Sequence, residues 1–189
     1  MRKVILFNRT SIDGFFTGPK GEIDWFIHDP EVDKAAHEMM DPDTIFFGRV
    51  TYQMFESYWP QVAKNPNAPM GAKALANELN EMTKIVFSTS LTNVTWENSK
   101  LVNGDLAKSV LEIKQSDGAD IVIFGSGSIV QQLTNEGLID EYLITVTPVV
   151  LGAGKPLFHD VKAVHRLKLK ETRSFASGNV LLHYEKLSR

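Results

Sequence analysis

The segment Ile121-Val-Ile-Phe-Gly-Ser-Gly-Ser-Ile-Val-Gln131 joins a short apolar run to a glycine-rich turn and then to the start of an amphipathic stretch. The run is short and β-branched, as buried strands are, and the glycines allow a tight turn into a helix. A strand that leads directly into a helix is the repeating step of a parallel sheet covered by helices. The segment therefore favours an α/β fold.

Other short apolar runs extend this pattern and span residues 4–7, 44–47, 85–87, 142–150 and 180–184. Apolar spacing and capping residues predict helices over residues 30–40, 51–58, 72–82, 105–115 and 127–135. Near the end, residues 166–172 alternate in character, and a turn at Ser177-Gly178-Asn179 leads into the last run. We therefore expect a mainly parallel central sheet flanked by helices, with an antiparallel hairpin at its C-terminal edge.

The composition limits the classes of function. The chain has 189 residues, with 20 Lys and Arg against 23 Asp and Glu, so its formal net charge is −3. This length suits one domain over residues 1–189, and the acidic balance argues against a nucleic-acid binder held by phosphate contacts. The absence of cysteine excludes thiol catalysis and Cys-ligated metals, and the scattered histidines show no metal spacing, so no metal site is predicted.

The apolar runs are also too short for a secretion signal or a membrane span. We therefore expect a cytoplasmic protein that acts on a small molecule and contacts neither nucleic acid nor membrane.

Three strand ends carry residues that suit a phosphate ligand. Glycines and serines follow the run at 121–124, Gly48-Arg49-Val50-Thr51 follows the run at 44–47, and Ser88 and Thr89 follow the run at 85–87. Each motif alone also fits an ordinary turn or a surface side chain. Because parallel strands present their carboxyl ends at one sheet edge, we expect the three to meet. Together they suit a ligand with more than one phosphate better than a carbohydrate or a metal.

Residues 11–21 follow the first run and contain three glycines within eight residues. This composition predicts a mobile lid, with an ordinary long loop as the alternative.

Seven short motifs, in this order, resemble the dihydrofolate reductase-like superfamily. The likeness is greatest to stand-alone relatives of the reductase domain of the bacterial bifunctional riboflavin-biosynthesis deaminase-reductase. The motifs are Ser11-Ile-Asp-Gly14, Gly48-Arg-Val-Thr-Tyr52, Val86-Phe-Ser-Thr89, Phe124-Gly-Ser-Gly-Ser-Ile129, Leu138-Ile-Asp-Glu141, Pro148-Val-Val-Leu-Gly152 and Pro156-Leu-Phe158.

The resemblance implies an NADPH-dependent reductase that transfers hydride to a small heterocyclic or carbonyl substrate, riboflavin-precursor-like or pterin-like. It assigns as cofactor-binding residues Ser11, Thr17, Gly48, Arg49, Thr51, Ser88, Thr89, Gly125, Ser126, Gly127, Ser128 and Ile129. Of these, residues 125–129 would cradle the pyrophosphate, and Arg49 would meet the 2′-phosphate. Asp13 is the catalytic candidate for proton delivery, with water as the alternative. The resemblance also implies a cis peptide between Gly125 and Ser126, and a homodimer.

The chain departs from these relatives in two respects. The helix acid that serves the pterin ring in true dihydrofolate reductase would fall on Val32, so we expect the neighbouring Asp33 to be a solvated helix residue. The zinc-binding pattern of the deaminase half is also missing. Three alternatives therefore stay open: a genuine dihydrofolate reductase, a non-catalytic NADPH-binding module, and a homo-oligomeric scaffold with an empty cleft.

Overall fold

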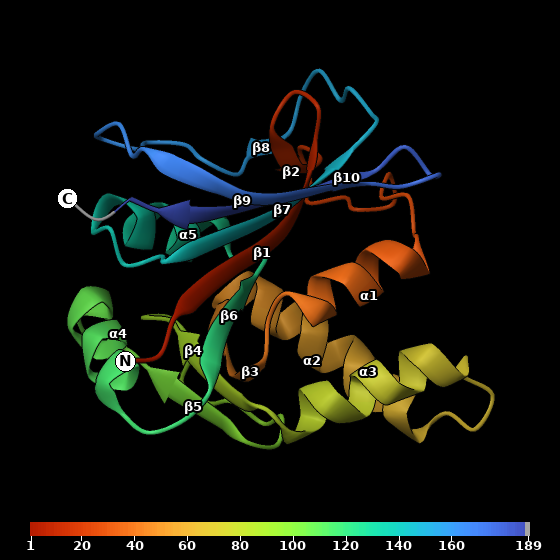
Figure 1. The fold of residues 1–189 in the computed structure, drawn as a ribbon. Coiled ribbons are helices and arrows are strands. Elements are labelled where there is room, and N and C mark those ends of the chain that lie inside the picture. The colour runs from red at the N-terminus through yellow and green to blue at the C-terminus, as the bar shows by residue number, and fades with distance from the viewer. Residues whose placement is uncertain (188–189) are drawn as a thin grey trace.

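The computed structural model describes residues 1–187 and contains an eight-stranded sheet in the order β5-β4-β3-β6-β1-β7-β10-β9 (Figure 1). The strands are β1 (Val4–Ser11), β3 (Pro42–Gly48), β4 (Thr83–Phe87), β5 (Ser99–Val102), β6 (Asp120–Phe124), β7 (Glu141–Thr147), β9 (Leu167–Ser174) and β10 (Val180–Lys186). The strands from β5 to β7 pair in parallel, whereas β10 is antiparallel to both β7 and β9. The predicted α/β fold with its C-terminal hairpin is confirmed.

Helices cover both faces of the sheet. One face packs against α1 (Pro30–Glu38), α2 (Arg49–Lys64) and α3 (Met70–Glu81), and the other against α4 (Leu106–Gln115) and α5 (Gly127–Asn135) (Figure 1). All five predicted helices are present, although α2 continues through Pro60, beyond its predicted end. None of the helices within residues 1–187 is both long and apolar enough to cross a bilayer.

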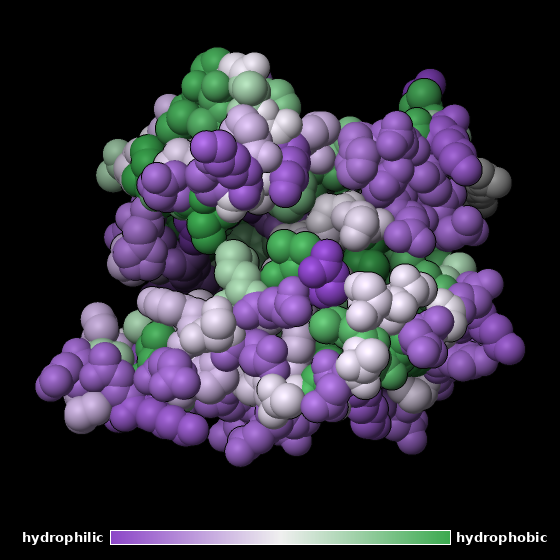
Figure 2. Space-filling view, turned by 180° about the vertical axis from the view of Figure 1, so that it is seen from behind, coloured by the Kyte–Doolittle hydropathy of each residue, from purple (hydrophilic) through white to green (hydrophobic). Residues whose placement is uncertain are grey.

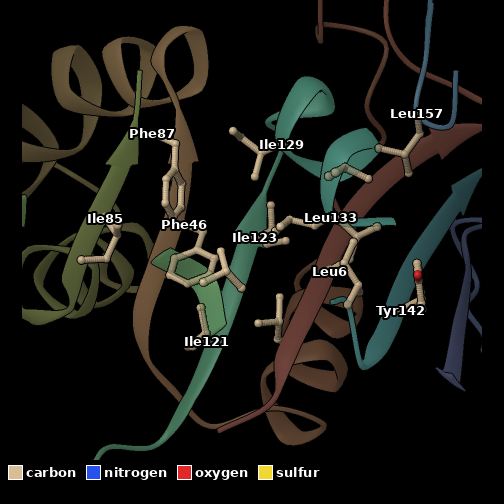
Figure 3. Close-up of a cluster of buried hydrophobic side chains, with 14 residues drawn as sticks. Leu6, Phe46, Ile85, Phe87, Ile121, Ile123, Ile129, Leu133, Tyr142 and Leu157 are labelled. Carbon is tan, nitrogen blue, oxygen red and sulfur yellow. The ribbon is translucent and has the colours of Figure 1, made fainter. Parts of the chain in front are cut away.

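The largest buried cluster lies between the sheet and α5. Leu6, Phe46 and Ile123 point from neighbouring strands toward Ile129 and Leu133 of α5 (Figure 3). Both faces of these strands are covered, so their sequences are almost continuously apolar rather than alternating. This burial explains why the central strands were predictable from their short apolar runs.

Three strands lie outside the prediction. Strand β5 lacks a long apolar run because it pairs at the sheet edge, where its side chains are only partly buried. Strands β2 (Phe15–Thr17) and β8 (Lys155–Pro156) form a separate antiparallel pair. This pair ties the expected mobile loop at residues 11–21 to a segment that is distant in sequence, so the loop is a paired flap.

A buried carboxylate links the first strand to the C-terminal hairpin. Oε1 of Glu141 accepts hydrogen bonds from Lys3 Nζ at 2.8 Å and Lys170 Nζ at 3.0 Å, and Oε2 lies 2.7 Å from His183 Nε2. Burial alone raises the pKa of Glu141, but the hydrogen bonds from Lys3, His183 and Lys170 outweigh it and lower that pKa to about 2. The ionised side chain thus stabilises the junction of β1, β7, β9 and β10.

We predict that Glu141→Gln lowers the free energy of unfolding at pH 7 by about 3 kcal/mol, because the folded pKa lies well below the ordinary value of 4.5. A carboxylate with a depressed pKa stabilises the fold above pH 4.5 and loses this effect as the pH falls toward 2. The difference from wild type should therefore shrink at pH 3, as measured by urea unfolding. Glu185→Gln, which removes an exposed ion pair with Lys168, is the control and should change little. An equal loss at both pH values would contradict this assignment.

Candidate functional site

A cleft of about 2020 Å³ opens along the carboxyl ends of β4, β3, β6 and β1. Ligand pockets commonly measure roughly 300–1000 Å³, so this cleft has room for a ligand with several ring systems. Figure 2 shows a hollow between the upper and lower parts of the molecule, with hydrophobic side chains around it. The sequence-predicted residues that line the cleft are Thr17, Gly48, Arg49, Thr51, Ser88, Thr89, Gly125, Ser126, Gly127, Ser128 and Ile129.

The glycine turn after β6 is held by side chains from its neighbouring strand ends. The hydroxyl of Ser126 accepts a hydrogen bond from the Gly48 N–H at 3.0 Å, and the Ser126 N–H donates to Thr51 Oγ1 at 2.9 Å. On the other side, Asn8 Oδ1 accepts a hydrogen bond from the Gly125 N–H at 2.7 Å, and Asn8 Nδ2 donates one to the Gly125 carbonyl at 3.0 Å. The N–H groups of Gly125 and Ser126 are therefore engaged within the protein, which corrects the expectation that they are free donors.

The backbone of this turn leaves no space for an added side chain at Gly125. Both Gly125 and Ser126 have a φ of 54°, and a Cβ on Gly125 would lie 2.9 Å from Thr51 Oγ1. All peptide bonds within residues 1–187 are trans, so the expected cis bond between Gly125 and Ser126 was wrong. Two successive left-handed residues reverse the chain here instead, which a resemblance between motifs could not indicate.

Two helices begin at this turn without a capping side chain. Their N-cap residues are Gly48 for α2 and Ser126 for α5, and neither accepts a capping hydrogen bond, whereas α1 and α4 are capped by Asp29 and Asp105. The first N–H groups of a helix carry a partial positive charge and bind anions. Because β3 and β6 are neighbours, both positive helix ends face the same part of the cleft.

Side chains with free donors surround these helix starts. Arg49 lies in the first turn of α2, 3.3 Å from Gln53 Oε1, and no carboxylate within residues 1–187 forms an ion pair with it. The Ser88 hydroxyl accepts hydrogen bonds from the N–H groups of Ser90 and Leu91, so it also shapes the turn after β4. Arg49 is therefore the side chain best suited here to bind a second anionic group.

Two predicted residues lie away from the cleft. The carboxylate of Asp13 accepts hydrogen bonds from the N–H groups of Leu151 and Gly152, at 3.2 and 2.7 Å. The Ser11 side chain and these N–H groups lower the pKa of Asp13. Neither Ser11 nor Asp13 lines the cleft, and both hold turns of the flap region. A catalytic role for Asp13 stays a prediction, and its geometry is that of a loop anchor.

The opposite wall contains charged residues that sequence reasoning missed. Arg9 of β1 forms an ion pair with Asp33 of α1, and His28 Nδ1 lies 3.6 Å from Asp33 Oδ2. All three residues line the cleft, so Asp33 is not simply a solvated helix residue. The available signal was the alternation of side chains along β1, which places Arg9 on the same face as the buried Ile5 and the partly buried Phe7.

The turn of the C-terminal hairpin holds this wall in place. The Ile27 carbonyl accepts hydrogen bonds from Arg9 Nη1 at 3.4 Å and from Asn179 Nδ2 at 3.2 Å. The Ser177 hydroxyl donates a hydrogen bond to the carboxylate of Asp29, which also caps α1. The sequence predicted only a turn for Ser177 and Asn179, because no local pattern indicates that they contact residues far away in the sequence.

The RibD C-terminal domain family matches residues 2–181. YyaP of Bacillus subtilis (strain 168), an uncharacterized protein, is 36% identical over 183 residues, covering 97% of this chain and 94% of YyaP.

Two solved structures share the fold. One is a protein of Shewanella sp. PV-4 linked by name to riboflavin biosynthesis, with a TM-score of 0.74, 22% identity and coverage of 98% of this chain and 99% of that one. The other is dihydrofolate reductase of Enterococcus faecalis complexed with NADP(H), with a TM-score of 0.63, 14% identity and coverage of 98% and 97%. These matches confirm the dihydrofolate reductase-like fold, and the chain belongs to the RibD C-terminal domain family.

Proposed function

We propose that this protein is an NADPH-dependent reductase of a small heterocyclic or carbonyl compound. Membership of the RibD C-terminal domain family supports a reductase-type function. The observation that carries the proposal is the pair of uncapped helix starts at neighbouring strand ends, beside the unpaired Arg49. NADPH, when bound, would supply the hydride, and the protein would supply binding and orientation.

The residues of the cleft fit the phosphates of this cofactor in two groups. The first N–H groups of α2 and α5 and the Ser128 hydroxyl would bind the pyrophosphate, because they are donors that no capping side chain occupies. Arg49, Ser88 and Thr89 would bind the 2′-phosphate, for which a guanidinium is suited by its paired donors. With a net charge of −3, the chain attracts an anion through these local donors and not through its overall field.

The remaining predicted residues build the site. Gly48, Thr51, Gly125 and Ser126 would hold the turn through their mutual hydrogen bonds, and Ile129 would pack beneath Gly48. We propose water as the proton donor, since the carboxylate of Asp13 is bound to backbone N–H groups outside the cleft.

A second candidate is a dihydrofolate reductase, and the position of Asp33 on the cleft wall favours it. Folate turnover and stoichiometric methotrexate binding would distinguish it from a reductase of another substrate.

NADPH at 100 times its Kd should raise the melting temperature by about 5–10 °C, because such occupancy stabilises a fold by about 2.7 kcal/mol. Differential scanning fluorimetry with NADPH and NADH in parallel tests this expectation. No shift with either nucleotide would overturn the proposal. Tight binding without oxidation across a broad substrate panel would instead indicate a binding module that lacks catalysis.

Arg49→Ala should weaken NADPH binding by about tenfold or more and leave NADH binding nearly unchanged, because only NADPH carries the 2′-phosphate. Isothermal titration calorimetry measures both affinities. Arg166→Ala removes another exposed arginine, at the other end of the chain from this site, and serves as the control. Equal losses for the two nucleotides would reject the assignment of Arg49.

Gly127 is the first residue of α5, and a Cβ added there would lie 2.7 Å from the Phe16 ring. Gly127→Ala should therefore weaken NADPH binding by about tenfold. Gly71→Ala adds a methyl group in open space and should preserve affinity. Calorimetric titration of both variants, with melting temperatures as a check on folding, decides the matter. An unchanged affinity for Gly127→Ala would remove α5 from the proposed phosphate site.

A further inference from the structure

An aromatic strip lines the cleft from the strand ends outward. It consists of Phe7, Phe124, Phe55, Trp59 and Tyr58, and all five side chains line the cleft. The ring centroids of successive members are 5.9, 5.9, 6.1 and 5.1 Å apart, and the Phe55 and Phe124 rings are stacked at an interplanar angle of 24°. The other three pairs are inclined by 68°, 51° and 81°, so the strip is a contiguous row of rings that presents both faces and edges.

The two ends of the aromatic strip differ in exposure and surroundings. Phe124 directly precedes the glycine turn, so the inner end adjoins the proposed cofactor site. Tyr58 is 57% exposed and lies two turns along α2 from the helix start, so the outer end reaches solvent. A flat ligand that lies along the strip extends away from the cofactor and contacts more than one ring.

The charged groups on the facing wall are largely neutralised within the protein. Arg9 pairs with Asp33, and His37 Nδ1 of α1 lies 3.7 Å from Glu78 Oε1 of α3. Besides Arg49, the lysines that line the cleft without a carboxylate partner within residues 1–187 are Lys34 on this wall and Lys155 of β8, and both are exposed. A phosphate bound here would have to separate Arg9 from Asp33 or rely on lysines that are exposed to solvent.

We propose, building on the reductase function above, that the substrate is an uncharged, flat, multi-ring carbonyl compound such as a quinone. The strip offers ring faces and edges from several side chains to a multi-ring ligand, and the pairing of Arg9 with Asp33 selects against a phosphorylated ribosyl pyrimidine. In the reaction, one hydride from NADPH and one proton from water convert the quinone to the hydroquinone, and NADP⁺ is released. The hydride carries both electrons, so no further oxidant or reductant is needed.

The test is calorimetric titration of the full chain, without cofactor, with 1,4-naphthoquinone and with uridine 5′-monophosphate. The chain has no cysteine, so the quinone has no thiol to modify. Naphthoquinone should bind saturably, and uridine monophosphate should bind at least about tenfold more weakly. Trp59→Leu should weaken naphthoquinone binding about tenfold, and Tyr58→Ala, at an exposed position where folding is not at risk, about threefold.

Lys34→Ala is the matched control on the opposite wall and should leave the affinity for naphthoquinone unchanged. Tighter binding of uridine monophosphate, abolished by Lys34→Ala, would overturn the proposal, as would strip variants that bind naphthoquinone like wild type. NADPH binding, measured separately by thermal shift, should survive in Tyr58→Ala. If the wild-type protein does not bind NADPH, the reductase function is rejected, while the calorimetry still decides which class of ligand the strip binds.

Discussion

The hydrogen bonds of Ser126 to Gly48 and Thr51 hold the ends of β3 and β6 together, and the geometry of the cleft depends on them. The N-cap residue of α2 is Gly48, which has no side chain, and the hydroxyl of Ser126, the N-cap residue of α5, is already used to join the strands. Both helices consequently start with donors that no side chain satisfies. The free donors of the cleft are thus a consequence of how the turn is built, and the proposed anion binding needs no excess of basic residues.

Much of the fold was predictable because its signals are local. Short apolar runs, capping residues and the glycine turn indicated the central strands, all five helices and the C-terminal hairpin. The partners of Asn8, Arg9 and Asn179 were not predictable, since their hydrogen bonds reach residues far away in the chain, such as Gly125 for Asn8. The contacts of Asp13 to the N–H groups of residues 151 and 152 were not predictable either, because its motif is local and these contacts are long-range.

The two walls of the cleft use charge in different ways. At the helix starts, Arg49 has no carboxylate partner within the part of the chain that the structure describes, and backbone donors accompany it. On the facing wall, Arg9 is paired with Asp33, and His37 Nδ1 lies 3.7 Å from Glu78 Oε1. One region therefore offers donors to an anion, whereas the other carries its own ion pair, and the proposed cofactor and substrate would occupy these two regions respectively.

The bond from Asn179 to the Ile27 carbonyl spans 152 residues, and it affects the order in which the protein can be completed. During synthesis, β1, β6 and β7 could pair before the last two strands leave the ribosome. The segment before α1 would at that stage be held by Arg9 alone, because Ser177 and Asn179 arrive with the final hairpin. The nascent chain would hence acquire its glycine turn first and complete the contacts of its second wall only with the last strands.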